Sequence, residues 1–165
     1  MKKLFPFAFL ISFVALSWLA WNLFFPSPEK ICLRQMAALA QTATFGEQTN
    51  PLTRAAKAQS LLGQFTADAQ LDFEIAGIGA RHFAGRDEIQ DACTGAFAGL
   101  RLLRVQFLDA TAQVAPDQQT VTVSCTAKVF VNDTKDFGVS EMRFQWRKTK
   151  DGWRISKAET VQTLT

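Results

Sequence analysis

The chain has 165 residues, of which 48% are hydrophobic and 20% are charged, with a formal net charge of +3. This length suits one folded domain with a short appendage. The abundance of large apolar residues excludes an intrinsically disordered chain. Beyond Lys2 and Lys3 the acidic and basic residues nearly balance, so the chain lacks the basic surface expected of a nucleic-acid-binding protein.

The N-terminal segment has the pattern of a membrane anchor. Residues 4–25 carry no charged side chain, and as a helix they would be roughly 33 Å long, enough to cross a hydrocarbon core. A cleaved signal peptide would end in a small-x-small site, but this run ends in bulky Phe24-Phe25. We therefore favour an uncleaved anchor over residues 1–26 and a domain over residues 27–165. The leading lysines predict a cytoplasmic N-terminus in a bacterial inner membrane and a periplasmic or extracellular domain.

Two helices are predicted at the start of the domain. Ser27-Pro28-Glu29 supplies an N-cap hydroxyl, a proline at the first helical position and an acid in the first turn, which predicts a helix to about Thr44. Asn50-Pro51 repeats the opening signal for a second helix. The first helix is expected to bury Cys32, Met36 and Leu39, and the second Leu52, Ala55, Leu62 and Phe65.

The rest of the chain predicts a sheet and one more helix. A strand over residues 71–75 is followed by a loop over residues 80–85, and then by a helix whose apolar face runs from Ile89 to Leu100. The hydrophobic period then changes to two and predicts four strands, over residues 103–114, 120–131, 139–148 and 153–160. This order predicts an α+β fold with three helices packed on one face of a curved, mostly antiparallel sheet.

The order of these elements resembles the nuclear transport factor 2-like superfamily and its SnoaL-like members. The resemblance rests on Gly85-Arg86-Asp87-Glu88-Ile89 before the third helix and Gly152-Trp153-Arg154-Ile155 at the last strand, and it covers roughly residues 28–160. It implies a cone-shaped, cystatin-like fold with an apolar pocket. The superfamily contains isomerases, cyclases, dehydratases and hydrolases as well as binding and assembly domains, so the fold does not decide the function. The pocket is expected to contain Phe73, Phe97, Val105, Phe107, Phe144 and Trp146.

Two residues are candidates for general-base catalysis. His82 precedes the third helix, near the expected mouth of the pocket, and would need a carboxylate to orient it. Asp109 alternates in phase with the inward-facing residues of its strand, unless a bulge turns it outward. Asp72 and Glu74 share one strand face, but it is the face opposite to the apolar residues, so we expect both carboxylates to lie in water.

The composition argues against an enzyme. The chain has no tyrosine, whereas the resemblance implies a phenolic oxyanion donor in the isomerases and dehydratases. There is no Ser-His-Asp spacing and no glycine-rich phosphate loop, and one histidine with three dispersed cysteines predicts neither a metal site nor a cofactor. The three cysteines, Cys32, Cys93 and Cys125, lie among apolar neighbours, so we expect them to be buried free thiols. One disulfide with one thiol left over is the alternative.

We therefore predict a membrane-anchored module that binds another membrane or periplasmic protein, or a small apolar ligand, without catalysis. The alternative is a SnoaL-like enzyme (an isomerase, cyclase or hydrolase) that acts on a lipophilic molecule in the cone through Asp109 or His82. The last two strands carry a basic cluster, which we interpret as a solvated face or as a contact for anionic headgroups or an acidic partner. The resemblance also implies homodimers formed through the outer sheet face, with Arg143, Gln145 and Arg147 in the interface.

Overall fold

The computed structural model describes residues 26–75, 79–132, 135 and 137–161. Within these residues three helices and six strands confirm the predicted α+β class. In chain order they are α2 (Pro28–Ala43), α3 (Pro51–Leu62), β1 (Phe65–Ile75), β2 (Gly79–Ala84), α4 (Arg86–Gly99), β3 (Leu103–Val114), β4 (Thr120–Val131), β5 (Phe137–Thr149) and β6 (Gly152–Thr160).

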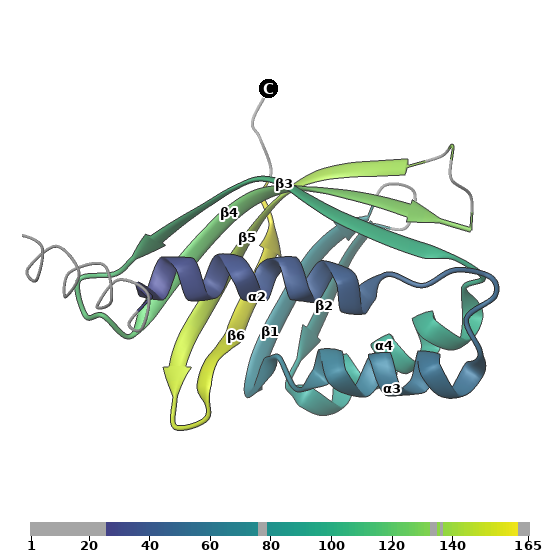
Figure 1. The fold of residues 1–165 in the computed structure, drawn as a ribbon, viewed down its shortest axis with the longest axis horizontal. Helices are drawn as coiled ribbons and strands as arrows, with labels where there is room; N and C mark the ends of the chain where they lie inside the picture. The colour runs from purple at the N-terminus through teal and green to yellow at the C-terminus, as the bar shows by residue number, and fades with distance from the viewer. Residues whose placement is uncertain (1–25, 76–78, 133–134, 136, 162–165) are drawn as a thin grey trace, which may run out of the picture.

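The six strands form one sheet in the order β2-β1-β6-β5-β4-β3. Neighbouring strands are antiparallel except for β1 and β6, which are parallel, so the prediction of a mostly antiparallel sheet is confirmed. The sheet curves, and the helices lie on its concave side (Figure 1). Among the described residues, no helix covers the opposite, convex side of the sheet.

The helices occupy different parts of the concave side. Helix α2 lies along β3 and β4, whereas α3 and α4 pack on each other at the end of the molecule where α2 ends (Figure 1). There the chain returns to the sheet, because Phe45 and Leu103 exchange backbone hydrogen bonds of 2.8 and 3.0 Å. The first residues of α2 consequently lie at the other end, beside the turn between β3 and β4 (Figure 1).

The core lies between α2 and the concave face. Alternate residues of β4 turn inward and are almost inaccessible, whereas their neighbours face outward, as expected for a strand with one covered face. Burial of each large apolar side chain contributes about 1.5–3 kcal/mol to the free energy of folding. The largest fully buried side chains are those of Cys32, Met36, Ile89, Val121, Val123, Trp146 and Ile155, and the burial predicted for Cys32, Met36 and Leu39 is confirmed.

The interpretation of residues 80–85 as a loop was wrong. Residues 79–84 form the edge strand β2, which pairs antiparallel with β1, and β1 itself begins at Phe65, six residues before the predicted strand. Most residues of β2 are exposed on both faces. Because Phe83 is the residue of β2 that packs against the core, this edge strand carries no hydrophobic period that a sequence pattern could reveal.

The predicted inner face of the second helix was right at Leu62 and wrong at Leu52 and Ala55. Leu52 is 81% exposed and Ala55 is exposed, whereas Ala58, Leu61 and Leu62 are buried. The helix ends at Leu62, so Phe65 belongs to β1 and not to the helical face. Once Phe65 is removed from the predicted helical face, the spacing of the other apolar residues no longer favours Leu52 over Leu61 as a buried residue.

Among the described residues no helix is both long and apolar enough to cross a membrane. The anchor predicted over residues 4–25 lies outside these residues. Helix α2 begins at Pro28, directly after an extended Ser27, as the opening signal predicted.

Candidate functional site

Five of the six side chains predicted to line a pocket belong to the core or pack against it, and the sixth, Val105, does not. Phe97, Phe144 and Trp146 are buried, and the other three are half-buried. The ring of Phe144 lies 5.5 Å from that of Phe107, edge to face, and 5.7 Å from that of Trp146. Aromatic pairs at these distances are in contact. The aromatic residues of the concave face are therefore in contact with one another.

Trp146 has one polar atom in this packed interior. Its side chain is 1% exposed, and its indole Nε1 has no hydrogen-bond partner among the described residues. A buried donor without a partner costs about 1–3 kcal/mol. A water molecule or a small ligand with an acceptor atom would satisfy this donor.

Asp109 lies outside the core. The register of β3 against β4 shifts between Leu108 and Thr111, and Asp109 adopts a φ of 52° and is exposed. This is the bulge considered as the alternative in the sequence, and aspartate tolerates the left-handed conformation better than most residues do. The carboxylate therefore lies outside the apolar interior in which the sequence placed a proton-abstracting base.

His82 and Asp72 form a pair. They lie opposite each other on β2 and β1, and His82 Nδ1 is 2.5 Å from Asp72 Oδ1. A carboxylate on one ring nitrogen orients an imidazole for general-base catalysis through the other. However, Leu71 and Phe83 occupy the inward positions of these strands, so the pair lies on the convex face, where the two side chains are 60% and 42% exposed.

The middle of the convex face carries paired charges. Arg143 Nη1 lies 3.3 Å from Glu159 Oε1, and Glu159 also accepts a hydrogen bond from Lys157. Arg147 donates a hydrogen bond to Asp68. The Arg147 hydrogen bond holds the pKa of Asp68 below its ordinary value, and the Glu159 hydrogen bond raises the pKa of Lys157. Solvent screens such pairs, which contribute about 0–1 kcal/mol each. The residues predicted for an interface, Arg143, Gln145 and Arg147, all lie on this face.

A groove of about 420 Å³ lies between α3 and α4. Of the six residues predicted to line a pocket, Phe97 alone is part of it. Its floor is apolar and its polar side chains are uncharged apart from Arg54. Its lining residues are Pro51, Arg54, Ala55, Ala58, Gln59, Leu62, Gln90, Thr94, Phe97 and Ala98.

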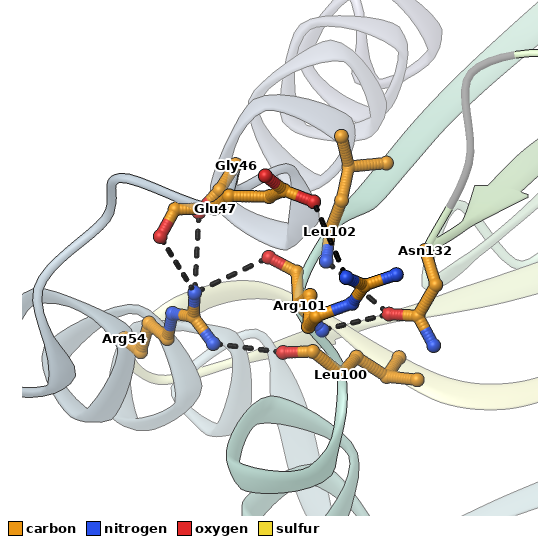
Figure 2. Close-up of polar contacts among 7 residues, drawn as sticks. All are labelled: Gly46, Glu47, Arg54, Leu100, Arg101, Leu102 and Asn132. Carbon is orange, nitrogen blue, oxygen red and sulfur yellow. Dashed lines mark hydrogen bonds and ion pairs between the residues drawn. The ribbon is translucent and has the colours of Figure 1, made fainter.

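Arg54 joins the two loops at one end of this groove. Its guanidinium lies 4.8 Å from the centre of the Phe45 ring, between the loop after α2 and the loop after α4 (Figure 2). Sequence reasoning missed this residue, because its partners are backbone carbonyls, which no residue pattern marks. Its nitrogen atoms donate to the carbonyl oxygens of Gly46, Glu47, Thr49, Leu100 and Arg101 at 2.7–3.4 Å.

Asn132 extends this network to the hairpin between β4 and β5. Its side-chain oxygen accepts hydrogen bonds from the backbone N–H groups of Arg101, at 2.7 Å, and Leu102, at 3.4 Å (Figure 2). Asn132 has a φ of 56°, a conformation that asparagine tolerates. The loops at this end of the domain are consequently tied to the end of β4.

The three cysteines are free thiols, as the default interpretation expected. Burial raises the pKa of both Cys32 and Cys125 to about 12, and it also raises the pKa of Cys93. Nucleophilic attack needs the thiolate, so these residues are inert at neutral pH. In the part of the chain that the structure describes, no three histidine, cysteine or carboxylate side chains gather into a metal site.

A long helix across a curved sheet, with a helix pair at one end, defines the cystatin-like cone of nuclear transport factor 2-like proteins. A family model described as a SnoaL-like domain matches residues 54–159. The chain therefore belongs to the SnoaL-like domain family. Among curated proteins, none matches the chain.

Solved structures share this fold at low sequence identity. A nuclear transport factor 2-like protein from Novosphingobium aromaticivorans is 21% identical, with a TM-score of 0.58 over 97% of this chain and 90% of its own. A candidate scytalone dehydratase from the same organism is 13% identical, with a TM-score of 0.59 over 81% of this chain and 82% of its own. A chain of the yeast deubiquitinase Ubp3 and Bre5 cofactor complex is 11% identical, with a TM-score of 0.60 over 82% of this chain and 98% of its own. The names of these structures point to different functions, so the likeness establishes the fold alone.

Proposed function

We propose that this chain is a membrane-tethered, non-catalytic binding module. Its SnoaL-like domain binds a membrane or periplasmic protein, with a small apolar ligand as a further occupant. In this proposal residues 4–25 span the inner membrane and the domain lies on the outer side, in the periplasm of a Gram-negative bacterium. Tethering confines the domain to a thin layer at the membrane and so raises its effective concentration toward other membrane components.

The observation that carries the proposal is the packing of the cone. Trp146 and Phe144 are 1% and 4% exposed, and Phe144 packs on both Trp146 and Phe107. A substrate needs a concave site that buries most of its surface next to a reactive group. Here the aromatic side chains occupy the interior, while Asp109 projects from a bulge outside it. The Ubp3 and Bre5 complex shows that a chain with this fold serves as part of a protein assembly.

Two surfaces supply binding area in this proposal. The convex face, with Arg143, Gln145 and Arg147, would serve a homodimer, because no helix of the described residues covers it and it carries charges of both signs. The groove between α3 and α4 would take the small apolar ligand, because its floor is apolar. Both surfaces lie outside the packed interior, so neither requires the core to open.

The test is purification of the tagged full chain from solubilised native membranes. We expect a stoichiometric companion protein that the Asp109→Asn and His82→Ala variants retain, because neither side chain takes part in binding. A chain whose residues 2–25 are replaced by a cleavable export signal should lose most of the companion, because tethering no longer concentrates it. Loss of the companion in both point variants, or turnover of a lipophilic compound that both abolish, would contradict the proposal.

An enzyme that acts on a lipophilic molecule is the second candidate, and the His82–Asp72 pair favours it. A carboxylate 2.5 Å from Nδ1 leaves the opposite ring nitrogen oriented toward solvent for proton transfer. The likeness to a candidate scytalone dehydratase makes lipophilic carbonyl or phenol compounds the first substrates to assay. If this pair is catalytic, Asp72→Asn and His82→Ala should each lower the rate by at least tenfold, and Glu74→Gln, on the same strand face, should not.

A further inference from the structure

One end of the convex face is apolar. Phe130 and Phe137 lie opposite each other on β4 and β5, and Val139 is the next residue of β5 on the same face. Leu108 of β3 lies on this face as well, since its register partner on β4 is an outward-facing residue. Phe137, Val139 and Leu108 are 51%, 56% and 45% exposed. Large apolar side chains grouped at the surface mark interaction sites more often than single exposed ones do.

Two cations lie over these rings. Lys128 Nζ is 3.8 Å from the centre of the Phe137 ring and 5.2 Å from that of Phe130, and the Arg104 guanidinium carbon is 6.0 Å from the latter. These are cation–π distances. We call Arg104, Leu108, Lys128, Phe130, Phe137 and Val139 the hairpin patch.

The charges of the hairpin patch differ from those in the middle of the same face. Arg143, Arg147 and Lys157 each pair with a carboxylate, whereas the ion pairs of the described residues include neither Arg104 nor Lys128. The hairpin patch therefore presents apolar surface together with two positive charges that have no carboxylate partner in the described part of the chain. A partner segment with both apolar and acidic side chains is complementary to it.

The hairpin patch lies at the end of the domain far from its first residues. Leu103 pairs both with Phe45, just after α2, and with Val131 beside the patch. Helix α2 has 16 residues and so extends roughly 24 Å from Pro28 to this end. A bilayer that holds residues 4–25 would lie at the start of α2, so this position favours a protein partner over a lipid surface.

We propose that the hairpin patch docks a segment of a partner protein that combines aromatic or branched apolar side chains with neighbouring carboxylates. This inference rests on the proposed function and names the partner's chemistry. The apolar side chains of the segment cover Phe137, Val139 and Leu108, and its carboxylates bind the Lys128 ammonium and the Arg104 guanidinium. Removal of water around these groups strengthens their attraction, and the rings already hold the Lys128 charge in place.

The probe is a fluorescent peptide, Ser-Glu-Phe-Glu-Leu-Asp-Ser, titrated with the full chain in uncharged detergent micelles and followed by anisotropy. We expect saturable binding that weakens at least tenfold in both Lys128→Glu and Phe137→Ser. Matched controls place the same changes elsewhere, at Lys150→Glu in the turn after β5 and at Leu52→Ser on exposed α3, and should leave the affinity within twofold. A peptide with lysine in place of its acids, or serine in place of phenylalanine and leucine, should bind at least tenfold more weakly.

Equal binding by the wild type and the two patch variants, or no binding of the peptide, would overturn the inference. So would binding to anionic vesicles that Lys128→Glu and Phe137→Ser abolish while the peptide stays unbound, because the patch would then serve a lipid surface. The proposed function fails differently. If the companion protein still co-purifies with Lys128→Glu, only the docking surface is wrong; if Asp109→Asn and His82→Ala both abolish a turnover, the binding role is wrong.

Discussion

At the scale of single residues, Trp146 is tightly packed, and its indole N–H has no hydrogen-bond partner among the described residues. We expect Trp146→Ala to lower the free energy of unfolding by about 3–5 kcal/mol, as truncation of a buried aromatic residue does. Trp146→Phe should cost clearly less, because it keeps a ring beside Phe144 and removes the unpaired Nε1–H. Urea denaturation followed by circular dichroism measures both. Equal losses would indicate that Nε1 has a bound partner in solution.

The buried thiols predict a pH dependence of stability. In the unfolded chain Cys32 and Cys125 ionise near their ordinary pKa of 9.0, whereas burial raises this pKa to about 12 in the folded chain. Between these values the unfolded chain releases thiol protons that the folded chain retains, so the free energy of unfolding falls as the pH rises from 9 to 12.

Urea denaturation at pH 8, 9, 10 and 11 measures this decline. Other groups also titrate in this range, so the control is the Cys32→Ala/Cys125→Ala double variant, in which the slope of stability against pH should be smaller. An unchanged slope would show that the thiols do not contribute.

The direction of the Asp109 side chain could not be predicted from the sequence. Its place in the alternation of β3 pointed inward, but the bulge between Leu108 and Thr111 reversed its direction. A one-residue shift of phase turns a side chain to the opposite face of a sheet, and sequence alternation alone does not locate such shifts. The pairing of His82 with Asp72 was likewise invisible, because it depends on a hairpin whose second strand has no apolar pattern.

At the scale of elements, the two helix openings differ in one measurable respect. The Asn50 side chain accepts a hydrogen bond of 2.7 Å from the Thr53 N–H at the start of α3, whereas Ser27 at the start of α2 makes no such bond. We expect Asn50→Ala to lower the free energy of unfolding by about 1 kcal/mol and Ser27→Ala by less than about 0.5 kcal/mol. Urea denaturation of the two variants compares them directly, and the reverse order would contradict the structure.

Arg54 holds three elements together. Removal of its guanidinium leaves carbonyl oxygens of the loops after α2 and α4 without their charged donor. Hydrogen bonds to a charged group contribute more than neutral ones, so we expect Arg54→Ala to cost about 2–4 kcal/mol. Thermal or urea denaturation measures the loss, with Arg81→Ala on exposed β2 as the matched control. A cost similar to that of the control would show that solvent replaces these bonds.

The elements with a clear hydrophobic pattern were predicted well. Strands β3 and β4 have the predicted bounds, and β5 and β6 differ from theirs by one or two residues at an end, because one face of each is apolar and turn residues separate them. Edge strand β2 was predicted wrongly, and so were two residues of the inner face of α3, Leu52 and Ala55. In both, local propensity gives a weak signal and the neighbours in space decide the outcome.

At the scale of the whole molecule, the proposed anchor sets how the chain behaves in cell fractionation. We expect the full chain to remain in the membrane pellet after carbonate extraction, because residues 4–25 would form a span of roughly 33 Å. A variant with residues 2–25 replaced by a cleavable export signal should be released by osmotic shock. Release of the unaltered chain under the same treatment, with its N-terminal residues removed, would exclude the tether.

In the two proposals, the tether and the hairpin patch lie at opposite ends of the domain. The membrane lies at the start of α2 in this proposal, and the patch lies roughly 24 Å away, where α2 ends. A partner in the same membrane would therefore reach the patch with a segment that stands away from the bilayer. The groove between α3 and α4 lies at this end as well (Figure 1).

The amino-acid sequence by itself determined the class of fold, the order of its elements apart from β2, and much of the core, because apolar period and helix-opening residues act through neighbours along the chain. Only the tertiary structure decided that Phe144 packs on Phe107, that Asp109 lies outside the core, and that Asp72 meets His82. It also decided the role of Arg54 and the grouping of Lys128 with Phe137. These features arise between residues that are distant in sequence and meet only when strands pair in register and loops close, so no local pattern encodes them.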